Sequence, residues 1–222
     1  MDHRQITWVV IAAYNEAAMI GHVVSSVLVD GWKVAVVDDG SPDDTAANAA
    51  AAGAVVLRHV VNLGQGAALQ TGIEFALGRG AERIVTFDAD GQHRVEDLPA
   101  MVAALDDADV ALGSRHLGGT EGAGSGRRLF LRAATAVSNK MSGVRLTDAH
   151  CGFRAFRATI APMLRMRQER MAHASELLGL IGKSGARVVE VPVTIRYTDY
   201  SKRKGQSPLQ AIRIMFDHAF RR

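Results

Sequence analysis

The sequence predicts an α/β protein built on a mostly parallel, doubly wound sheet with helices on both faces. Short apolar runs alternate with helix-like segments through the first half of the 222-residue chain. Runs such as Trp8–Ala12 are apolar throughout, as expected of strands buried on both faces. Polar residues follow several of these runs directly, which is typical of strands that end at a binding edge.

The first half of the chain supplies five predicted strands, each followed by a helix or a loop. The strands are Trp8–Ala12, Val34–Val37, Ala54–Leu57, Arg83–Phe87 and Val110–Leu112. The helices between them are Ala17–Val29, Asp43–Ala52, Ala67–Leu77 and Leu98–Leu105. Because a helix returns the chain to the start of the next strand, repeated units of this kind give parallel neighbours.

The alternation breaks after the fifth strand. Residues 113–126 carry six glycines and few apolar side chains, which predicts a loop near the site. Helices are expected over Arg127–Met141 and His173–Lys183, with a short strand at Phe153–Phe156 between them. Val188–Tyr197 alternates apolar and polar residues and contains Pro192, which favours an edge strand or a bulge.

The last stretch, Pro208–Arg222, predicts an amphipathic helix. Its apolar face carries Leu209, Ile212, Phe216 and Phe220, against Arg213, Asp217 and Arg221. We therefore expect one catalytic domain over residues 1–206 and a C-terminal helix over 207–222. That helix has three candidate roles: packing on the domain, a homodimer contact, or peripheral contact with a membrane surface.

Composition narrows the classes of protein. The formal net charge is +3, yet basic residues gather in clusters that suit phosphate-bearing partners or anionic lipid. The single cysteine, Cys151, excludes an intramolecular disulfide and is expected to be a buried thiol. We find no signal-peptide pattern and no apolar run long enough to span a membrane. A cytoplasmic protein is expected, soluble or peripheral at the inner face of the membrane.

Acidic residues gather where the predicted strands end. Tyr14-Asn15-Glu16 follows the first strand, Asp38-Asp39 the second, and Asp88-Ala89-Asp90 with Gln92 the fourth. Because parallel strands end at one edge of a sheet, these side chains should line one crevice. Two carboxylates one residue apart repel each other unless a cation lies near, and oxygen donors suit Mg²⁺ or Mn²⁺ carrying a diphosphate. Asp38 and Asp39 are candidate nucleotide contacts, whereas Asp43 and Asp44 are better explained as helix-start residues.

Other nucleotide motifs fit poorly. Gly64-Gln65-Gly66 resembles the start of a dinucleotide fingerprint, but it follows the third strand and Leu69 stands where the last glycine belongs. No phosphate loop of the Gly-Lys-Ser/Thr type occurs, which argues against ATP or GTP hydrolysis. An oxidoreductase and a non-enzymatic nucleotide-binding module remain weaker alternatives. The acid-lined crevice disfavours nucleic acid as a partner, and a nucleotidyltransferase would need a basic glycine-rich loop after the first strand.

Taken together, six segments resemble the family-2 glycosyltransferases of GT-A fold, most closely dolichyl-phosphate mannose synthases and bacterial polyprenyl-phosphate glycosyltransferases. The segments are Val9–Glu16, Val36–Ser41, Asn62–Gly66, Phe87–His93, Gly113–Arg115 and Asp148–Arg154. Each is weak alone, but their order along the chain is specific for the family. Two departures are Arg94, where that subgroup usually has proline, and Lys204-Gly205-Gln206-Ser207 in the basic segment.

The resemblance implies roles for particular residues. Those implied to contact the nucleotide-sugar are Ala13, Tyr14, Glu16, Asp38, Asp39, Gly64, Asp88 and Ala89. Those implied to hold Mg²⁺ or Mn²⁺ are Asp88, Asp90 and Gln92. Those implied to bind acceptor or phosphate are Arg115, Arg128, Arg154, Lys202, Arg203 and Ser207. Asp148, Asp90 and Arg115 are the candidate catalytic residues.

The expected reaction moves a hexose from a donor of the GDP-mannose or UDP-glucose type, with inversion, to an acceptor. The resemblance favours a polyprenyl or dolichyl phosphate, and a soluble or glycan hydroxyl is the alternative. A phosphate monoester is largely dianionic near neutral pH, since its second pKa is about 6. It therefore needs no strong base, whereas a hydroxyl acceptor would need one, for which Asp148 and Glu176 are the candidates. His93 is either a phosphate contact or a packed side chain.

Overall fold

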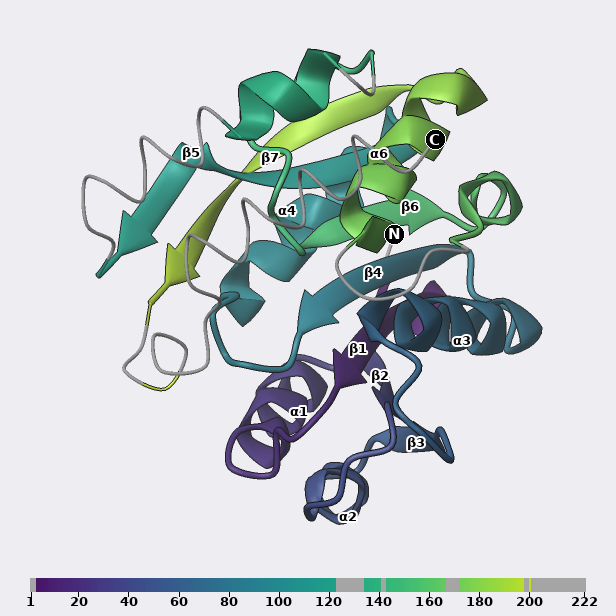
Figure 1. The fold of residues 1–222 in the computed structure, drawn as a ribbon, viewed down its shortest axis with the longest axis vertical. Coiled ribbons are helices and arrows are strands. Elements are labelled where there is room, and N and C mark those ends of the chain that lie inside the picture. The colour runs from purple at the N-terminus through teal and green to yellow at the C-terminus, as the bar shows by residue number, and fades with distance from the viewer. Residues whose placement is uncertain (1–2, 123–133, 141–142, 167–171, 198–199, 201–222) are drawn as a thin grey trace.

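The structure is a computed structural model, and it describes residues 3–122, 134–140, 143–166, 172–197 and 200 (Figure 1). Its strands are β1 (Thr7–Ala13), β2 (Lys33–Asp38), β3 (Val55–Arg58), β4 (Arg83–Asp88), β5 (Val110–Glu121), β6 (Arg154–Arg157) and β7 (Val188–Arg196). Its α-helices are α1 (Ile20–Val29), α2 (Thr45–Ala51), α3 (Gln65–Gly78), α4 (Leu98–Ala103) and α6 (Ala172–Ser184), and residues 134–140 are helical as well. Short 3₁₀ turns are η1 (His3–Ile6), η2 (Val95–Asp97), η3 (Ala104–Asp106) and η4 (Ala161–Leu164).

The strands form one sheet in the order β3-β2-β1-β4-β6-β5-β7. Every neighbouring pair is parallel except those that involve β6, which runs antiparallel to both β4 and β5. A strand that runs the other way begins where its neighbours end. The chain leading into β6 therefore lies at the same edge as the end of β4, and β6 begins beside Leu112 of β5.

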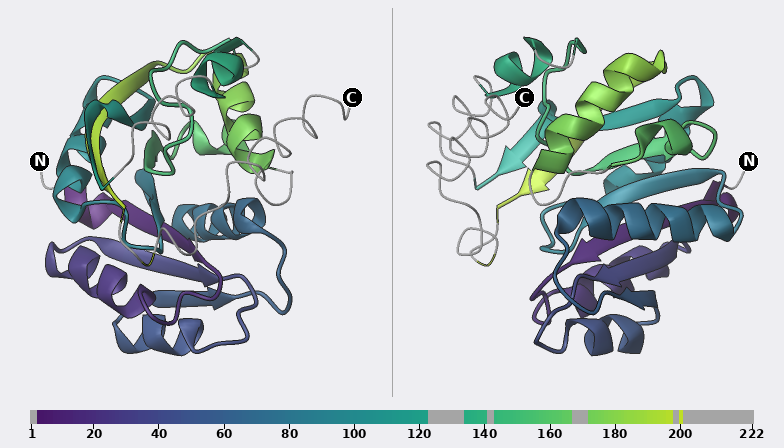
Figure 2. Two further views of the ribbon diagram at one scale, coloured as in Figure 1. Left: turned by 60° about the vertical axis from the view of Figure 1, so that its left-hand side comes forward. Right: turned by 45° about the vertical axis from the view of Figure 1, so that its right-hand side comes forward.

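Helices cover both faces of the sheet, as predicted (Figure 2). One core packs α1 and α4 against residues such as Val9 and Ile11 of β1. The other core packs α3 and α6 against Val10 of β1 and Phe156 of β6. Successive strand residues thus enter opposite cores, which explains why the strands read as continuous apolar runs.

The predicted strands and helices within the described residues are confirmed with ends that match or differ by up to three residues, except at the end of β5. Of the helix predicted at Arg127–Met141, residues 134–140 are helical and the rest lies outside the described residues. The edge position of β7 is confirmed too, and Pro192 lies where its pairing with β5 changes register, between Ser114 and Gly119. In the described part of the chain no helix is long and apolar enough to cross a membrane. The predicted C-terminal helix at 207–222 lies outside the described residues.

The loop predicted at residues 113–126 is wrong up to residue 121, because β5 continues through Glu121 and pairs with β7. Glycine content suggested a loop, but at Gly118 it has a different cause. A β-carbon there would lie 2.3 Å from the carbonyl oxygen of Val193. Glycine is needed because two backbones approach closely, a cause that composition cannot distinguish from a loop.

The packing of α3 on the sheet gives a test of the fold. A β-carbon at Gly72 would lie 2.3 Å from Cγ1 of Val10, so Gly72→Ala should overpack the core and cost about 1–3 kcal/mol. Gly78→Ala at the end of the same helix meets nothing within 4 Å and should be neutral or stabilising by up to about 1 kcal/mol. Urea denaturation of both variants checks this, and equal midpoints would contradict the packing.

Candidate active site

The strand register brings the predicted site residues to one edge of the sheet. Asp88 pairs with Ala12 of β1, and the next β1 residue, Ala13, pairs with Asp38 of β2. Arg154 at the start of β6 pairs with Thr86. The ends of β1, β2 and β4 and the beginning of β6 therefore form the floor of a single site. Ala13 and Ala89 are buried in this floor, while the side chain of Tyr14 is 43% exposed beside it.

The two aspartates after β4 have opposite electrostatic environments. Burial raises the pKa of Asp90 to about 6, and the negative charge of Asp88 adds to the rise. Burial would also raise the pKa of Asp88, but His93, Arg154 and Arg115 outweigh it and the pKa is lowered. At Asp90 the nearby positive charge of His93 is outweighed by burial and by Asp88, whereas at Asp88 positive charge prevails.

The donor set fits a divalent cation shared with a substrate. Asp88 and Asp90 offer hard oxygen ligands, and burial together with the charge of Asp88 raises the pKa of Asp90, an unfavourable environment that a bound cation would relieve. Among the described residues, no cluster of three or more His, Cys, Asp or Glu side chains could hold a metal ion. The remaining ligands would come from Gln92 and from phosphate oxygens, as is usual for Mg²⁺.

Two arginines approach the acid pair from β5 and β6, and both are buried. Arg115 donates from Nε to Oδ2 of Asp148 at 2.5 Å and from Nη1 to the hydroxyl of Tyr197 at 2.9 Å. Burial alone would lower the pKa of Arg115, but Asp148 outweighs it and raises the pKa. Burial lowers the pKa of Arg154, and the charge of Asp88 offsets only part of this. Within the described residues, no carboxylate forms an ion pair with Arg154.

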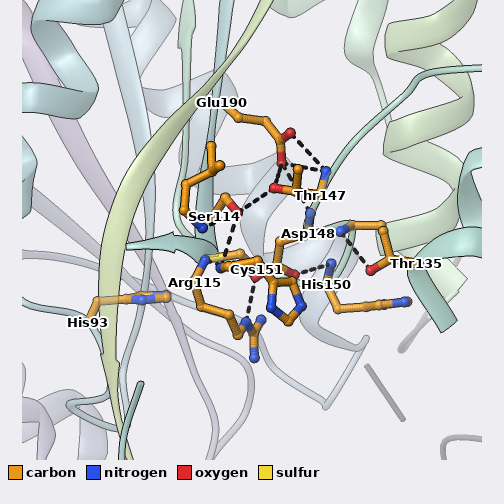
Figure 3. Close-up of polar contacts among 12 residues, drawn as sticks. His93, Ser114, Arg115, Thr135, Thr147, Asp148, His150, Cys151 and Glu190 are labelled. Carbon is orange, nitrogen blue, oxygen red and sulfur yellow. Dashed lines mark hydrogen bonds and ion pairs between the residues drawn. The ribbon is translucent and has the colours of Figure 1, made fainter. Parts of the chain in front are cut away.

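Both oxygens of the buried Asp148 carboxylate accept hydrogen bonds from other groups of the protein (Figure 3). Oδ2 accepts from the backbone and side chain of Arg115, and Oδ1 accepts from the backbone N–H of His150 at 3.1 Å. The candidate base is therefore committed to an ion pair. Its geometry assigns it to holding Arg115 in place, and a role in proton abstraction would require this pair to break.

The loop before β6 is anchored from two further elements. Glu190 on β7 accepts hydrogen bonds from the backbone N–H of Thr147 at 2.8 Å and of Asp148 at 3.0 Å. Thr135 accepts from the backbone N–H of Ala149 at 3.3 Å. Figure 3 shows these contacts converging on the loop. Nothing in the sequence around Glu190 indicates this role, because its partners lie more than 40 residues away.

Asp38 and Asp39 are buried and bonded within the protein. Asp38 accepts from the backbone N–H of Ser41 at 3.1 Å and pairs with Arg58 at 3.1 Å. Asp39 accepts from His59 at 2.8 Å and from the backbone N–H of Gly64 at 2.7 Å. Both aspartates hold the loops around the end of β2. Donor contact by either one stays a prediction, and a donor would have to compete with these bonds.

Glu16 lies at the opening of the site and has a partner that the sequence did not suggest. Its Oε2 accepts from the hydroxyl of Tyr200 at 2.7 Å, so the chain beyond β7 reaches the end of β1. Burial raises the pKa of Tyr200, and the hydrogen bond to Glu16 raises it further. A contact over 184 residues leaves no local signal in the sequence.

Several predicted residues stay untested. Arg128, Lys202, Arg203 and Ser207 lie outside the described residues. Glu176 lies on α6, and its role as a base stays a prediction.

Cys151 is a free, buried thiol, which confirms the predicted buried cysteine. Burial raises its pKa to about 12, which argues against a role as a nucleophile.

Comparison of the sequence with models of protein families identifies the family of this chain. The model described as "Glycosyl transferase family 2" matches residues 8–162. The chain belongs to the family 2 glycosyltransferases. An uncharacterized protein of Methanocaldococcus jannaschii is 35% identical over 216 residues, which cover 94% of this chain and 89% of the relative. The polyprenol monophosphomannose synthase of Mycolicibacterium smegmatis is 33% identical over 224 residues, covering 94% of this chain and 84% of that protein.

Two further comparisons agree with the family. The UDP-N-acetylglucosamine–dolichyl-phosphate N-acetylglucosaminyltransferase of Methanococcus voltae is 28% identical over 236 residues, covering 96% of this chain and 94% of the relative. The crystal structure of glucosyl-3-phosphoglycerate synthase from Mycobacterium tuberculosis superposes with a TM-score of 0.67 at 23% identity, covering 96% of this chain and 79% of that one. The expected GT-A fold is confirmed. Membership of the family sets aside the oxidoreductase and the non-enzymatic module.

The acid pair of this family 2 glycosyltransferase gives a pH test. The folded pKa of Asp90, about 6, lies above its ordinary 3.8, so the metal-free protein loses stability as pH rises through 6. The lowered pKa of Asp88 contributes stability above pH 4 that is lost on acidification. At pH 8 with chelator, Asp90→Asn should therefore stabilise by on the order of 2 kcal/mol, and Asp88→Asn should destabilise.

Urea denaturation at pH 5 and pH 8 measures both effects. The gain from Asp90→Asn should shrink at pH 5, where the wild-type carboxyl already carries a proton. Effects of the same sign for the two variants at pH 8 would contradict the assignment.

The buried pair of Arg115 and Asp148 gives a second test. Asp148→Asn leaves a buried guanidinium without its counter-charge and should cost about 3–5 kcal/mol of unfolding free energy. Asp109→Asn makes the same change in the surface pair with Arg187 and should cost within about 1 kcal/mol. Similar losses in a denaturant titration would show that the pair of Arg115 and Asp148 is not the anchor of this loop.

Proposed function

We propose that the protein is an inverting, metal-dependent glycosyltransferase that moves a hexose from a nucleotide-sugar to a polyprenyl or dolichyl phosphate. The donor is of the GDP-mannose or UDP-glucose type. One observation carries the choice of acceptor: the candidate base Asp148 is held in a buried ion pair with Arg115. An acceptor that arrives as an anion needs no base, and a phosphate monoester is such an acceptor.

The donor side of the proposal rests on the edge formed by β1, β2 and β4. Asp88 and Asp90, with Gln92, would hold Mg²⁺ or Mn²⁺ against the donor diphosphate. The cation would supply charge neutralisation for the departing nucleoside diphosphate. Glu16 and Tyr14 would contact the nucleotide at this edge, as would Gly64, whose backbone N–H donates to Asp39.

The acceptor side rests on the buried arginines. A phosphate oxygen attacks the anomeric carbon, the bond from that carbon to the diphosphate oxygen breaks, and the nucleoside diphosphate leaves with the electron pair. No proton is transferred in this step. Arg115, oriented by Asp148 and Tyr197, would hold the phosphate, and Arg154 would add positive charge behind it.

The relatives support the same acceptor. The relative from Mycolicibacterium smegmatis is named for the synthesis of polyprenol monophosphomannose, and the one from Methanococcus voltae for sugar transfer with dolichyl phosphate. Peripheral contact with the inner face of the membrane would follow from such a substrate. For residues 207–222 the three candidate roles stay predictions: packing on the domain, a homodimer contact, or contact with a membrane surface.

Paired acceptors test the proposed function. A short polyprenyl phosphate should accept sugar from GDP-mannose, UDP-glucose or UDP-N-acetylglucosamine with Mn²⁺, while the matching polyprenol, which lacks the phosphate, should not. The measurement is transfer of radiolabelled sugar into the organic phase. Asp90→Asn should abolish transfer, and Asp44→Asn, an exposed acid at the start of α2, should keep it. Transfer to the polyprenol at a comparable rate would refute the phosphate acceptor.

A further inference from the structure

We propose that His93 and Gly152 form a socket that fixes the carboxylate of Asp88 in its working orientation. The inference rests on the proposed function, because the carboxylate is held for a divalent cation and the donor diphosphate. Both residues are positioning residues that act through Asp88. They come from different parts of the chain, since His93 follows β4 and Gly152 precedes β6.

His93 supplies one wall of the socket. Its Nε2 lies 2.8 Å from Oδ2 of Asp88. Among the described residues neither ring nitrogen of His93 has an aligned hydrogen-bond partner, so Nε2 and Asp88 form a close polar contact. A ring nitrogen this close to a carboxylate oxygen must carry the hydrogen, because two lone pairs would repel.

The ring of His93 has little freedom to move. Its centroid lies 5.2 Å from that of Phe87 and 4.9 Å from that of Phe153, and the side chain is 6% exposed. A β-bridge to Ile195 holds its backbone. The aromatic contacts fix the ring, and the ring in turn fixes one oxygen of Asp88.

Gly152 supplies the opposite wall. A β-carbon there would lie 2.6 Å from both carboxylate oxygens of Asp88, well inside van der Waals contact. The carboxylate therefore rests directly on the backbone of the loop that Asp148 and Glu190 anchor. The hydroxyl of Thr86 donates to the carbonyl of Gly152 at 2.8 Å, which ties this backbone to β4 itself.

Asp88 needs such a socket because charged neighbours act on its carboxylate. Asp90 repels it, while Arg154 and Arg115 attract it. Forces of this kind would favour rotation of an unsupported carboxylate. Contact with His93 and with the Gly152 backbone opposes that rotation before any cation binds. The surroundings thus preorganise Asp88 as a metal-coordinating side chain.

The test is direct binding of Mn²⁺, measured by the electron paramagnetic resonance signal of the free ion with saturating UDP or GDP. In Gly152→Ala the methyl group displaces the end of a side chain and no backbone, so the fold should survive. The carboxylate must move by about 1 Å, and Mn²⁺ affinity should fall at least about tenfold. Gly179→Ala on α6, where a β-carbon meets nothing within 4 Å, is the matched control and should bind as wild type.

Variants of His93 separate positioning from packing. His93→Phe keeps an aromatic ring between Phe87 and Phe153 but removes the nitrogen, and it should lose about as much Mn²⁺ affinity as Gly152→Ala. His93→Gln restores a side-chain N–H near the same place and should recover part of that loss. If His93→Phe binds Mn²⁺ as wild type does, His93 only fills space and its half of the socket is refuted.

A double-mutant cycle links the glycine to the aspartate. If Gly152 acts through Asp88, Gly152→Ala should have no further effect on Mn²⁺ affinity in an Asp88→Asn background. An equal effect in both backgrounds would overturn the inference. If the wild type binds Mn²⁺ and both Gly152→Ala and His93→Phe bind it with the same affinity, the socket is refuted but the proposed function is not. Wild type that binds no Mn²⁺ with either nucleotide would refute the proposed metal dependence, and the socket with it.

Discussion

The buried ion pair between Arg115 and Asp148 is the interaction on which the rest of the site depends. It joins the middle of β5 to the loop before β6, and the hydroxyl of Tyr197 beyond β7 completes it. A buried pair of this kind adds little net stability, but the loss of one partner is costly, so it specifies one arrangement of the two segments. The same pair explains the proposed chemistry. It keeps a guanidinium oriented in the site and removes the carboxylate that would otherwise serve as a base.

The site contains both acidic and basic groups that are buried. Burial and the charge of Asp88 raise the pKa of Asp90, and Arg154 has no carboxylate ion-pair partner among the described residues. Ligands that bring a cation to the aspartates and a phosphate to the arginines would satisfy both kinds of group at once. The complementary partners are expected to come from the substrates.

The fold could be predicted from the sequence wherever a single physical rule determines the pattern of residues. Buried parallel strands read as apolar runs, and polar residues at their ends located Asp88, Asp90 and the edge that they share. Prediction failed at β5, because Gly118 is required by close approach to Val193 and composition alone suggests a loop. Tyr200 and Glu190 escaped notice because their contacts depend on how distant strands are brought together. The burial of Asp38 and Asp39 was also hidden, since a strand-end aspartate has the same sequence signature whether it meets a ligand or holds a loop.

The reversed direction of β6 has a consequence for engineering. Because this strand begins at the binding edge, it ends at the opposite edge, where Arg157 pairs with Arg83 at the start of β4. The turn that follows, with the exposed Thr159 at its tip, is therefore separated from the substrates by the full length of the strand. A reporter peptide or an affinity tag inserted into that turn would lie on the side of the enzyme opposite the binding edge. The same graft in the chain entering β6 would obstruct catalysis.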